Sequence, residues 1–488
     1  MNFNKTIEFS YSKKEPRIIL SRMLIRCTNS FMGIRINRKA ISHIFILFLA
    51  MAFIIFLTFT AIAKSKTKYF IIDAELKTHL KDLARPILMK AGIPPETLQI
   101  FIIKDATIGA FVTPGMKLFI HTGLIMKTKT PSQLLGVLAH EIGHIAAGHL
   151  IRRREAIQDS QNISALGLVL GSLAAATTQS GEVATALAYG TQNASMASLL
   201  KFSRGQENAA DQAAINYLIA TNISPLGMLE FLKILEKEET LVVSRRSQYA
   251  TTHPHTHDRI NFVKNQLSLN QNLNSSLSPS KRDRHARILA KLIGFIQTPE
   301  ETFRNYPKSN STITAQYARA IALYKKADLV EAVKALDQLI QIEPENPYFW
   351  ELKGQILLES NKRGIACDAF EKAYLYSDNP IILRQLAKAE LLLDTPNSNS
   401  SALKHLEEAI RMTPESPPTW KQLAVAQGRN GKIALAQLSL AEEALLRKNF
   451  TRALKNALFA KKNLQKDIYA YQRALDIINY AKQARNFE

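Results

Sequence analysis

Cysteine is scarce in this chain, whose 488 residues include two, Cys27 and Cys367. This scarcity excludes a framework of disulfide bonds and a metal site built from cysteine thiolates. The chain also lacks a motif of interleaved aromatic and basic residues, although its net charge is +22. Nucleic acid is therefore a poor candidate partner, and an anionic membrane surface or a plain solvated surface accounts better for the positive charge.

An uncharged apolar run, Ile44–Ala63, follows the basic residues Arg35, Arg38 and Lys39 and ends in an A-x-A sequence. A basic segment, an apolar core and this ending describe a secretory signal peptide. The run is also long enough to remain as a membrane anchor. Both alternatives place the rest of the chain across the cytoplasmic membrane, because the positive charge stays inside.

The most informative motif is His140-Glu141-Ile142-Gly143-His144, in an apolar segment that predicts a buried helix. Residues i and i+4 share a helical face, so the two histidines can bind one metal ion. The carboxylate of Glu141 can take a proton from a metal-activated water and pass it to a departing amine. The motif therefore predicts zinc-dependent peptide hydrolysis. The alternative, two histidines placed by chance, would leave unpaired polar groups in a buried helix, which is costly.

A catalytic zinc ion needs a third protein ligand, which we expect from another helix. Glu207 and Asp211 lie one turn apart in the segment Ser203–Asp211. This spacing suits Glu207 as the third ligand and Asp211 as the acceptor for the other N–H of a ligand histidine. If the segment stood alone, a solvated acidic stripe on an alanine-rich helix would be the favoured interpretation, but beside the HExxH motif it is the weaker one. His149, nine residues after His140, is expected on the opposite helical face as an ordinary surface or core histidine without a role at the metal site.

Together these motifs resemble the zinc metallopeptidase family of HtpX, Oma and the CAAX prenyl endopeptidases, over roughly residues 65–265. The residues that carry the resemblance are Pro114-Gly115, Thr122-Gly123-Leu124, the HExxH motif, and Ser203-Arg204 with Glu207 and Asp211. The resemblance implies a gluzincin-like fold in which His140, His144 and Glu207 bind one zinc ion. It also implies that Glu141 is the general base. Gly109 departs from the family, which usually has asparagine there.

Two further expectations follow from the resemblance. His253, in the His-Pro sequence before Arg259, can reach the zinc ion as a fourth ligand and hold the enzyme idle until substrate displaces it. The alternative is a loop whose histidines face water. The run Leu118–Gly123 is expected to be a strand along the cleft, to whose edge an extended substrate adds.

Between the two metal-binding helices, Ile163–Leu200 is rich in small residues. It lacks the ~18 strongly apolar residues that a membrane span requires. We therefore expect a packed pair of helices or a cover over the active site, with a further membrane-associated segment as the alternative.

The C-terminal half shows a repeat. Pro344, Pro380 and Pro414 recur at intervals close to the ~34 residues of a tetratricopeptide unit. Each is expected to close a pair of amphipathic helices. Small and aromatic residues such as Gly354 and Phe370 stand where helices of such a repeat pack together. Stacked repeats create a concave surface that binds extended peptides or protein partners.

The sequence therefore predicts a mainly α protein, with a gluzincin-like α+β metallopeptidase domain followed by an α-solenoid of tetratricopeptide repeats. The expected domains are an N-terminal extension with signal peptide or anchor (1–63), the zinc metallopeptidase domain (64–267), a linker and connecting helix (268–310) and the repeats (311–488).

The added repeats make the chain most similar to the BepA-type periplasmic members of the family. This similarity implies a periplasmic endopeptidase that cleaves misfolded or misassembled envelope and outer-membrane proteins recruited by the repeats, with the outer-membrane assembly machinery as a possible partner. The alternatives are a periplasmic chaperone or assembly factor with occasional proteolysis, and a protease anchored in the inner membrane and facing the periplasm.

Overall fold

The computed structural model describes residues 69–149, 203–241, 253–254, 256–269 and 277–485, with a few single positions between 152 and 249. The extension 1–63 and the segment Ile163–Leu200, for which we stated expectations, lie outside the described residues. Residues 68–488 form one compact unit. Within its described part, no helix is both long and apolar enough to cross a membrane.

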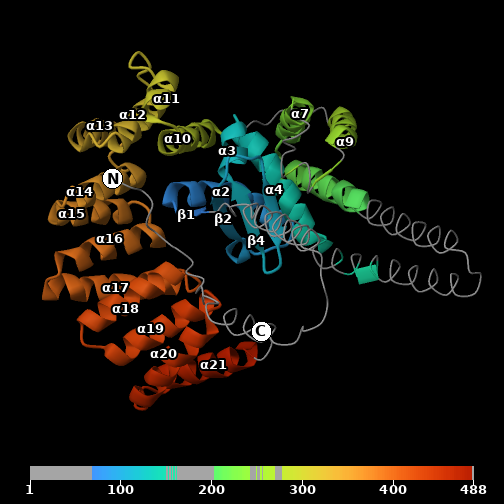
Figure 1. Ribbon diagram of the computed structural model, residues 1–488. Coiled ribbons are helices and arrows are strands. Elements are labelled where there is room, and N and C mark those ends of the chain that lie inside the picture. The colour runs from blue at the N-terminus through green and yellow to red at the C-terminus, as the bar shows by residue number, and fades with distance from the viewer. Residues whose placement is uncertain are drawn as a thin grey trace, which may run out of the picture. The chain divides into compact units, whose positions relative to one another are not determined.

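A four-stranded sheet forms the base of the N-terminal part of this unit (Figure 1). Its strands, in spatial order, are β1 (Tyr69–Ile71), β2 (Gln99–Lys104), β4 (Lys117–His121) and β3 (Ala110–Thr113). β2 and β4 run parallel, and the two outer pairs are antiparallel. Because side chains alternate along a strand, Ile100, Ile102, Leu118 and Ile120 share one buried face of the sheet.

The strand expected at Leu118–Gly123 is present as β4, which leads directly into α3 (Thr122–Lys127). The expectation that substrate adds to this strand is wrong, because β4 pairs with β2 on one side and with β3 on the other. The reason is a tight turn at Gly115 (φ 85°) and Met116 (φ 57°), which folds β3 back onto β4. The outer strand on this side of the sheet is therefore β3.

Helices cover the buried face of the sheet and build the core. They are α2 (Ala74–Lys90), the 3₁₀ turn η1 (Pro95–Thr97), α4 (Pro131–Ala146), an unlabelled helix over residues 203–220, α7 (Leu226–Leu241) and α9 (Thr256–Leu269). α7 packs along α4, and α9 packs against α7. A Cβ atom at Gly136 would lie 2.6 Å from the Cα of Met228, so glycine is needed where α4 meets α7.

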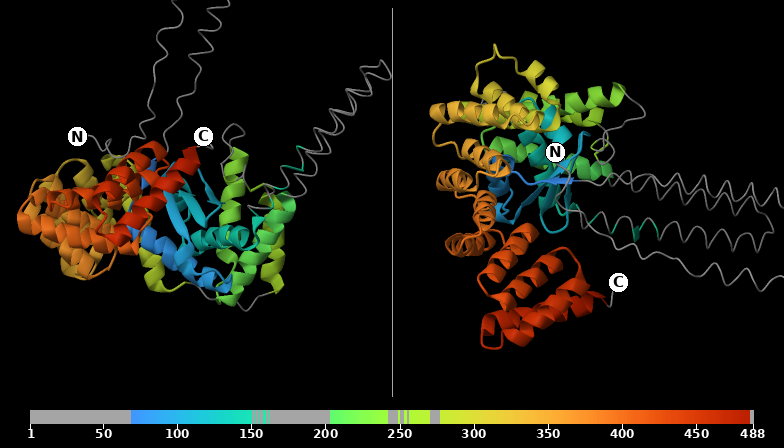
Figure 2. Two further views of the ribbon diagram at one scale, coloured as in Figure 1. Left: turned by 90° about the horizontal axis from the view of Figure 1, so that it is seen from below. Right: turned by 60° about the vertical axis from the view of Figure 1, so that its left-hand side comes forward.

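The C-terminal part is a series of antiparallel helices, each packed on the next (Figures 1 and 2). The helices are α10 (Pro279–Ile296), α11 (Pro299–Asn305), α12 (Ile313–Lys325), α13 (Leu329–Ile342), α14 (Pro347–Glu359), α15 (Arg363–Leu375), α16 (Pro380–Leu393), α17 (Pro396–Met412), α18 (Pro417–Arg429), α19 (Ile433–Leu446), α20 (Phe450–Asn463) and α21 (Ile468–Arg485). The expected class, an α+β domain followed by helical repeats, is confirmed.

Pro344 and Pro414 lie between one helical pair and the next, as expected, whereas Pro380 is the first residue of α16 and so opens the next pair. The carbonyl of Pro344 accepts a hydrogen bond of 2.8 Å from the indole N–H of Trp350, and Pro414 accepts one of 2.7 Å from Trp420. Gly354 lies against the ring of Phe370, where an added Cβ would be 3.1 Å away. The small and aromatic positions thus serve packing within the repeats.

Helix α10 ties the two parts together. The segment 268–310, expected to be a linker and a connecting helix, contains α10, which begins at Pro279. α10 contributes buried side chains to the core of the N-terminal part. Arg287 of α10 pairs with Glu75 of α2 at 2.6 Å, and Lys291 pairs with Asp73 at 2.7 Å. The repeats therefore begin on a helix that is anchored to the N-terminal core.

Candidate metal centre

The HExxH motif lies in the second half of α4, as the sequence predicts. The helix begins at Pro131, where the Thr130 side chain accepts a hydrogen bond from the backbone N–H of Gln133. The leucine, valine and alanine residues of α4 that follow are buried, so the helix lies inside the core. His140 and Glu141 are almost fully buried in it, at 1% and 0% exposure.

Gly143, inside the motif, lets the second helix come close. A Cβ atom there would lie 2.8 Å from the carbonyl oxygen of Ala210, so any larger residue would push the helix 203–220 away from α4. The close approach brings Glu207 and Asp211 to the histidine face of α4. The sequence therefore specifies both the donor groups and the glycine that allows them to meet.

Four buried side chains converge at this contact: His140, His144, Glu207 and His253. One nitrogen or oxygen atom of each lies within 4.8 Å of the others, so the four could hold a single metal ion. The Nε2 atoms of the two HExxH histidines are 3.0 Å apart. Each of these atoms is 3.3 Å from a carboxylate oxygen of Glu207. Three imidazoles and one carboxylate form a donor set that suits zinc.

The polar atoms around the cluster fit a bound cation. Both carboxylate oxygens of Glu141 and the Nε2 atom of His253 are buried and make no hydrogen bond among the described residues, although Nε2 lies 3.3 Å from Oε1 of Glu141. Burial raises the pKa of Glu141. Burial raises that of Glu207 as well, but the charge of His253 and the hydrogen bonds from His140 and His144 outweigh it and lower the pKa. A buried anion surrounded by imidazoles is the environment that a divalent cation completes.

Asp211 and Arg259 form a buried pair behind His140. The Oδ1 atom of Asp211 lies 2.7 Å from Nδ1 of His140, as expected for a carboxylate that orients a ligand histidine. Arg259 donates to both carboxylate oxygens at 2.8 Å. Burial and Arg259 act to lower the pKa of His140, but Asp211 outweighs them and raises it to about 9. We did not predict a role for Arg259, although the Arg-Ile sequence after His253 was a signal for it.

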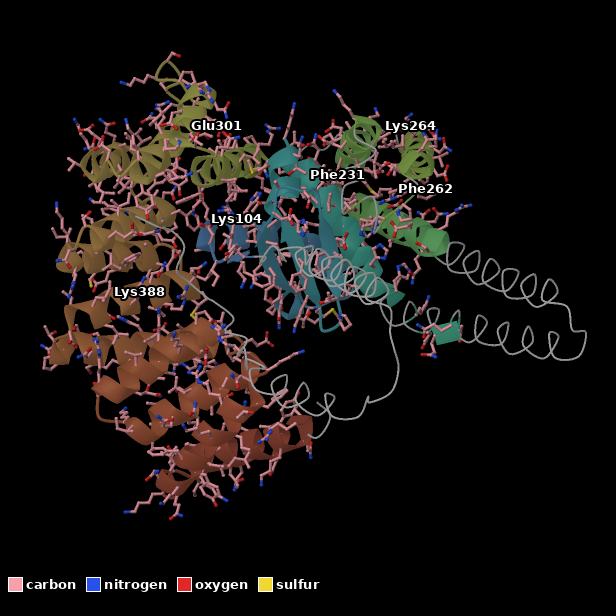
Figure 3. All side chains as sticks on the ribbon, in the orientation of Figure 1. Lys104, Phe231, Phe262, Lys264, Glu301 and Lys388 are labelled. Atoms are coloured by element: carbon pink, nitrogen blue, oxygen red, sulfur yellow. The ribbon has the colours of Figure 1, made fainter. Side chains whose placement is uncertain are left out.

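The position of His253 is fixed by Tyr249, which we also did not predict. The backbone N–H of His253 donates to the Tyr249 carbonyl at 2.7 Å, and the two rings stack with centroids 4.4 Å apart. Tyr249 is buried, and its ring meets that of Phe231 edge-on with centroids 5.5 Å apart. Phe231, in α7, is labelled in Figure 3. His257 lies outside the cluster, at the surface, with its Nδ1 atom 3.0 Å from Glu236. The side chain of His255 lies outside the described residues.

Gly109, where the sequence departs from the expected pattern, is explained by its neighbour His121. A Cβ atom at position 109 would lie 2.5 Å from Nδ1 of His121. This imidazole is fully buried and lies 2.9 Å from the hydroxyl of Thr107. The side chain of His121 therefore fills the space that a side chain at position 109 would need.

The expectation for His149 is wrong. The continuous helix ends before it, because Gly148 takes a left-handed conformation (φ 64°) and turns the chain. His149 is buried, and its Nδ1 atom lies 2.8 Å from Nδ1 of His144. Burial, aided by the nearby His144, lowers the pKa of His149 to about 4. A neutral imidazole there can accept the Nδ1–H of His144, which leaves the Nε2 atom of His144 directed to the cluster.

We expect the substitution His149→Ala to weaken zinc binding by the cluster about 10–100-fold, because groups that orient a metal ligand typically contribute that much. Competition with a chelator of known affinity measures the effect. His149→Asn keeps a hydrogen-bonding group and should recover part of the affinity. The control is His405→Ala in α17, which lies outside the cluster. Unchanged zinc affinity in His149→Ala would remove this role.

Comparison with known proteins agrees with the geometry. Residues 72–267 match the model of peptidase family M48. The beta-barrel assembly-enhancing protease of Yersinia pestis is 26% identical over 79% of this chain and 79% of its own length. Its counterpart in Escherichia coli (strain K12) is 28% identical over 68% of each. The mitochondrial metalloendopeptidase OMA1 of Schizosaccharomyces pombe is 25% identical over 39% of this chain and 52% of its own.

Solved structures that match include MamA from Desulfovibrio magneticus RS-1, with a TM-score of 0.30 and 17% identity over 34% of this chain and 94% of its own. YrrB, a TPR protein, has a TM-score of 0.28 and 17% identity over 39% and 100%. These TM-scores are too low to establish a shared fold, and the helix pairs described above define the repeats. The family match and the relatives agree with the buried metal-ligand cluster: the chain is a metalloendopeptidase whose residues 72–267 match the model of peptidase family M48.

Proposed function

We propose that the cluster binds one zinc ion per chain, through His140, His144 and Glu207. The observation that carries this proposal is the meeting of these side chains in a buried site beside the carboxylate of Glu141, which has no hydrogen-bond partner among the described residues. A zinc ion held there supplies Lewis acidity, which lowers the pKa of a water molecule and polarises a peptide carbonyl. Asp211 orients His140, and Arg259 holds Asp211 in place.

Glu141 is proposed as the general base. Its carboxylate takes a proton from the attacking water and delivers that proton to the nitrogen of the leaving group. The leaving group therefore departs as a neutral amine and not as an amide anion. Burial, which raises the pKa of Glu141, suits a group that must first accept and then release a proton. Neither oxygen has a hydrogen bond among the described residues, and the contact printed for Oε1 is with Nε2 of His253 at 3.3 Å, so displacement of His253 would leave the carboxylate free for these transfers.

An extended substrate is proposed to align along β3. Among the residues that the structure describes, this strand is the outer one on that side of the sheet and pairs with β4. The segment that enters β3 lies next to the cluster, because the Ile108 carbonyl accepts a hydrogen bond from the Tyr249 N–H at 3.1 Å. Main-chain hydrogen bonds to an outer strand bind a polypeptide with little regard to its side chains.

His253 is proposed to be a fourth, regulatory ligand. Its Nδ1 atom lies 3.1 Å from both carboxylate oxygens of Glu207 and 3.2 Å from Nε2 of His140. Its Nε2 atom lies 3.3 Å from Oε1 of Glu141, so the imidazole stands beside the carboxylate that would take a proton from water. Displacement of His253 by substrate would open the site.

If so, His253→Ala should raise the basal rate of casein cleavage. An increase of about tenfold would correspond to an idle state populated at about 90% in the parent. The rate is measured on zinc-loaded protein, with the surface substitution His257→Ala as control. An unchanged or lower rate in His253→Ala would remove the gating role.

In the cell, we propose that the enzyme acts in the periplasm on misfolded or misassembled outer-membrane and other envelope proteins. Three observations support this: the signal-like run Ile44–Ala63, the helical repeats, and relatives named beta-barrel assembly-enhancing proteases. The repeats would recruit the clients, or the machinery that assembles them. The signal-like run Ile44–Ala63 is proposed to be removed on export. The alternative is that it stays as an inner-membrane anchor.

A second function, as a chaperone or assembly factor, is favoured by the extent of the helical repeats. The substitution Glu141→Gln distinguishes the two functions when the variant is expressed in a strain that lacks the chromosomal gene. A protease loses its ability to restore envelope integrity, whereas an assembly factor keeps most of it. Sensitivity to a large antibiotic that intact outer membranes exclude measures the outcome, with equal protein levels as the control.

A further inference from the structure

The segment just ahead of β3 directs part of its backbone to the outer edge of the sheet. The backbone N–H of His121, at the end of β4, donates to the Gly109 carbonyl at 2.8 Å, so Gly109 faces β4. Hydrogen-bonded and non-hydrogen-bonded pairs alternate along an antiparallel ladder. The backbone groups of Ile108, Ala110 and Val112 therefore point away from β4, to the edge at which a substrate strand is proposed to add.

Tyr249 already occupies part of this edge. Its backbone N–H donates to the Ile108 carbonyl at 3.1 Å, which is the main-chain contact that a strand of substrate would make there. Ala110 and Val112 follow Ile108 at every second residue on the same edge. A substrate strand that extends along the edge to Ile108 must therefore displace Tyr249.

Tyr249 is tied to His253 both by its backbone and by its ring. The Tyr249 carbonyl accepts a hydrogen bond of 2.7 Å from the backbone N–H of His253, and the two rings stack with their planes 30° apart. The Nδ1 atom of His253 lies 3.1 Å from both carboxylate oxygens of Glu207. One short chain of contacts thus joins the substrate edge to the metal-ligand cluster.

Packing against neighbouring side chains holds Tyr249 in this position. The residue is 1% exposed, and its ring centroid lies 5.5 Å from that of Phe231 and 6.4 Å from that of His140. None of these contacts needs a metal ion. They therefore keep Tyr249 at the strand edge whether or not the cluster holds zinc.

We propose that Tyr249 and His253 form an internal competitor of the substrate, which occupies the strand edge at Ile108 and the metal-ligand cluster at the same time. A substrate strand that takes over the Ile108 carbonyl displaces Tyr249, and His253 leaves the cluster with it. The site therefore opens in response to main-chain pairing, which any extended polypeptide can make. The proposal rests on the peptidase function and the substrate strand proposed above, and it specifies how substrate displaces His253.

Substrate binding with and without zinc distinguishes this mechanism from one in which His253 acts only as a zinc ligand. Competition at the strand edge persists when zinc is removed, whereas competition for the zinc ion does not. Labelled β-casein, an unfolded polypeptide, is titrated with protein carrying Glu141→Gln, first loaded with zinc and then stripped of it by a chelator. Fluorescence anisotropy gives the Kd in each state.

The substitution Tyr249→Ala removes the ring that holds the internal competitor in place. In both metal states it should lower the Kd for β-casein about tenfold, which corresponds to an edge that the competitor occupies about 90% of the time in the parent. Tyr249→Phe keeps the ring and should stay closer to the parent. The matched control is Tyr469→Ala, at a 90% exposed position of α21, which should leave the Kd within about twofold.

A second substitution shows whether the gain in binding arises at β3. Val112→Pro removes a backbone N–H that points to the outer edge and leaves the hydrogen bonds to β4 in place, a position at which edge strands tolerate proline. Added to Tyr249→Ala, it should raise the Kd to the parental value or above. The unfolding midpoint shows whether each variant is folded.

If Tyr249→Ala does not fold, hydrogen exchange in the Glu141→Gln protein provides the same test. Saturating β-casein should speed exchange of the Tyr249 amide, which loses its acceptor at Ile108, and slow exchange of the amides of Ala110 and Val112.

Four results would overturn the proposal: no binding of β-casein, an unchanged Kd in folded Tyr249→Ala, a gain in binding that is lost without zinc or survives Val112→Pro, and a Tyr249 amide that casein does not expose. A zinc-loaded parent with intact Glu141 that binds casein but does not cleave it would instead contradict the proposed function and leave this inference standing.

Discussion

Replacing Glu141 with glutamine is expected to lower kcat for peptide cleavage by about 10²–10⁴-fold, the usual contribution of a general base. Glutamine has nearly the same shape as glutamate but cannot accept a proton from water. Because Glu141 is proposed as the base and not as a metal ligand, the zinc content of Glu141→Gln should equal that of the parent. Cleavage of casein and metal analysis on the same preparation measure both quantities.

The matched control is Glu238→Gln, on the surface of α7, where the carboxylate pairs with Lys127 at 2.5 Å. It makes the same chemical change without touching the cluster and should keep full activity. Cleavage at the parental rate by Glu141→Gln would show that another group moves the proton. Loss of zinc together with activity would show that Glu141 contributes to metal binding.

Replacing Asp211 with alanine is expected to be the most destabilising of the substitutions considered. It leaves the guanidinium of Arg259 buried without its bidentate partner, and breaking a buried pair on one side costs about 3–5 kcal/mol. It also removes the group that orients His140, which should weaken zinc binding about 10–100-fold. Urea unfolding of the metal-free protein and chelator competition measure the two effects separately.

The double substitution Asp211→Ala with Arg259→Leu distinguishes these effects. Removing both charges should recover much of the stability, because no uncompensated ion stays buried. Zinc affinity should stay low, since His140 still lacks its acceptor. The account of this pair would be wrong if Asp211→Ala were as stable as the parent, or if the double variant bound zinc with parental affinity.

The metal-ligand cluster could be predicted from sequence because the spacing of its residues within each helix is visible in short segments of the chain. Two histidines four residues apart share a helical face, and Glu207 and Asp211 share another. The structure brings both faces together, and it explains why Gly143 stands between the histidines. That the helices meet was inferred from a resemblance, since spacing within one helix says nothing about its neighbour.

The errors arose where the backbone leaves regular geometry. His149 was placed by extending α4 past Gly148, but a left-handed glycine ends the helix and turns His149 towards His144. β4 was expected to border the cleft, but the turn at Gly115 adds β3 outside it. Arg259 and Tyr249 were missed because their roles depend on contacts between segments far apart in sequence.

The repeats were predictable for a different reason. A period close to the ~34 residues of one unit is visible without knowledge of tertiary contacts, since each unit packs mainly on the next. The same property limits what the pattern reveals. It identifies the positions that pack helices together, such as Gly354 against Phe370, but not the partner that the exposed surface binds.

The most direct test of the central claim is the zinc content of the purified protein, measured beside its casein cleavage and compared with His140→Ala. The account predicts one zinc ion per chain with cleavage in the parent, and neither in His140→Ala. It also predicts that a chelator abolishes cleavage and that added zinc restores it. A parent that binds no zinc, or that cleaves casein equally well after His140→Ala, would contradict it.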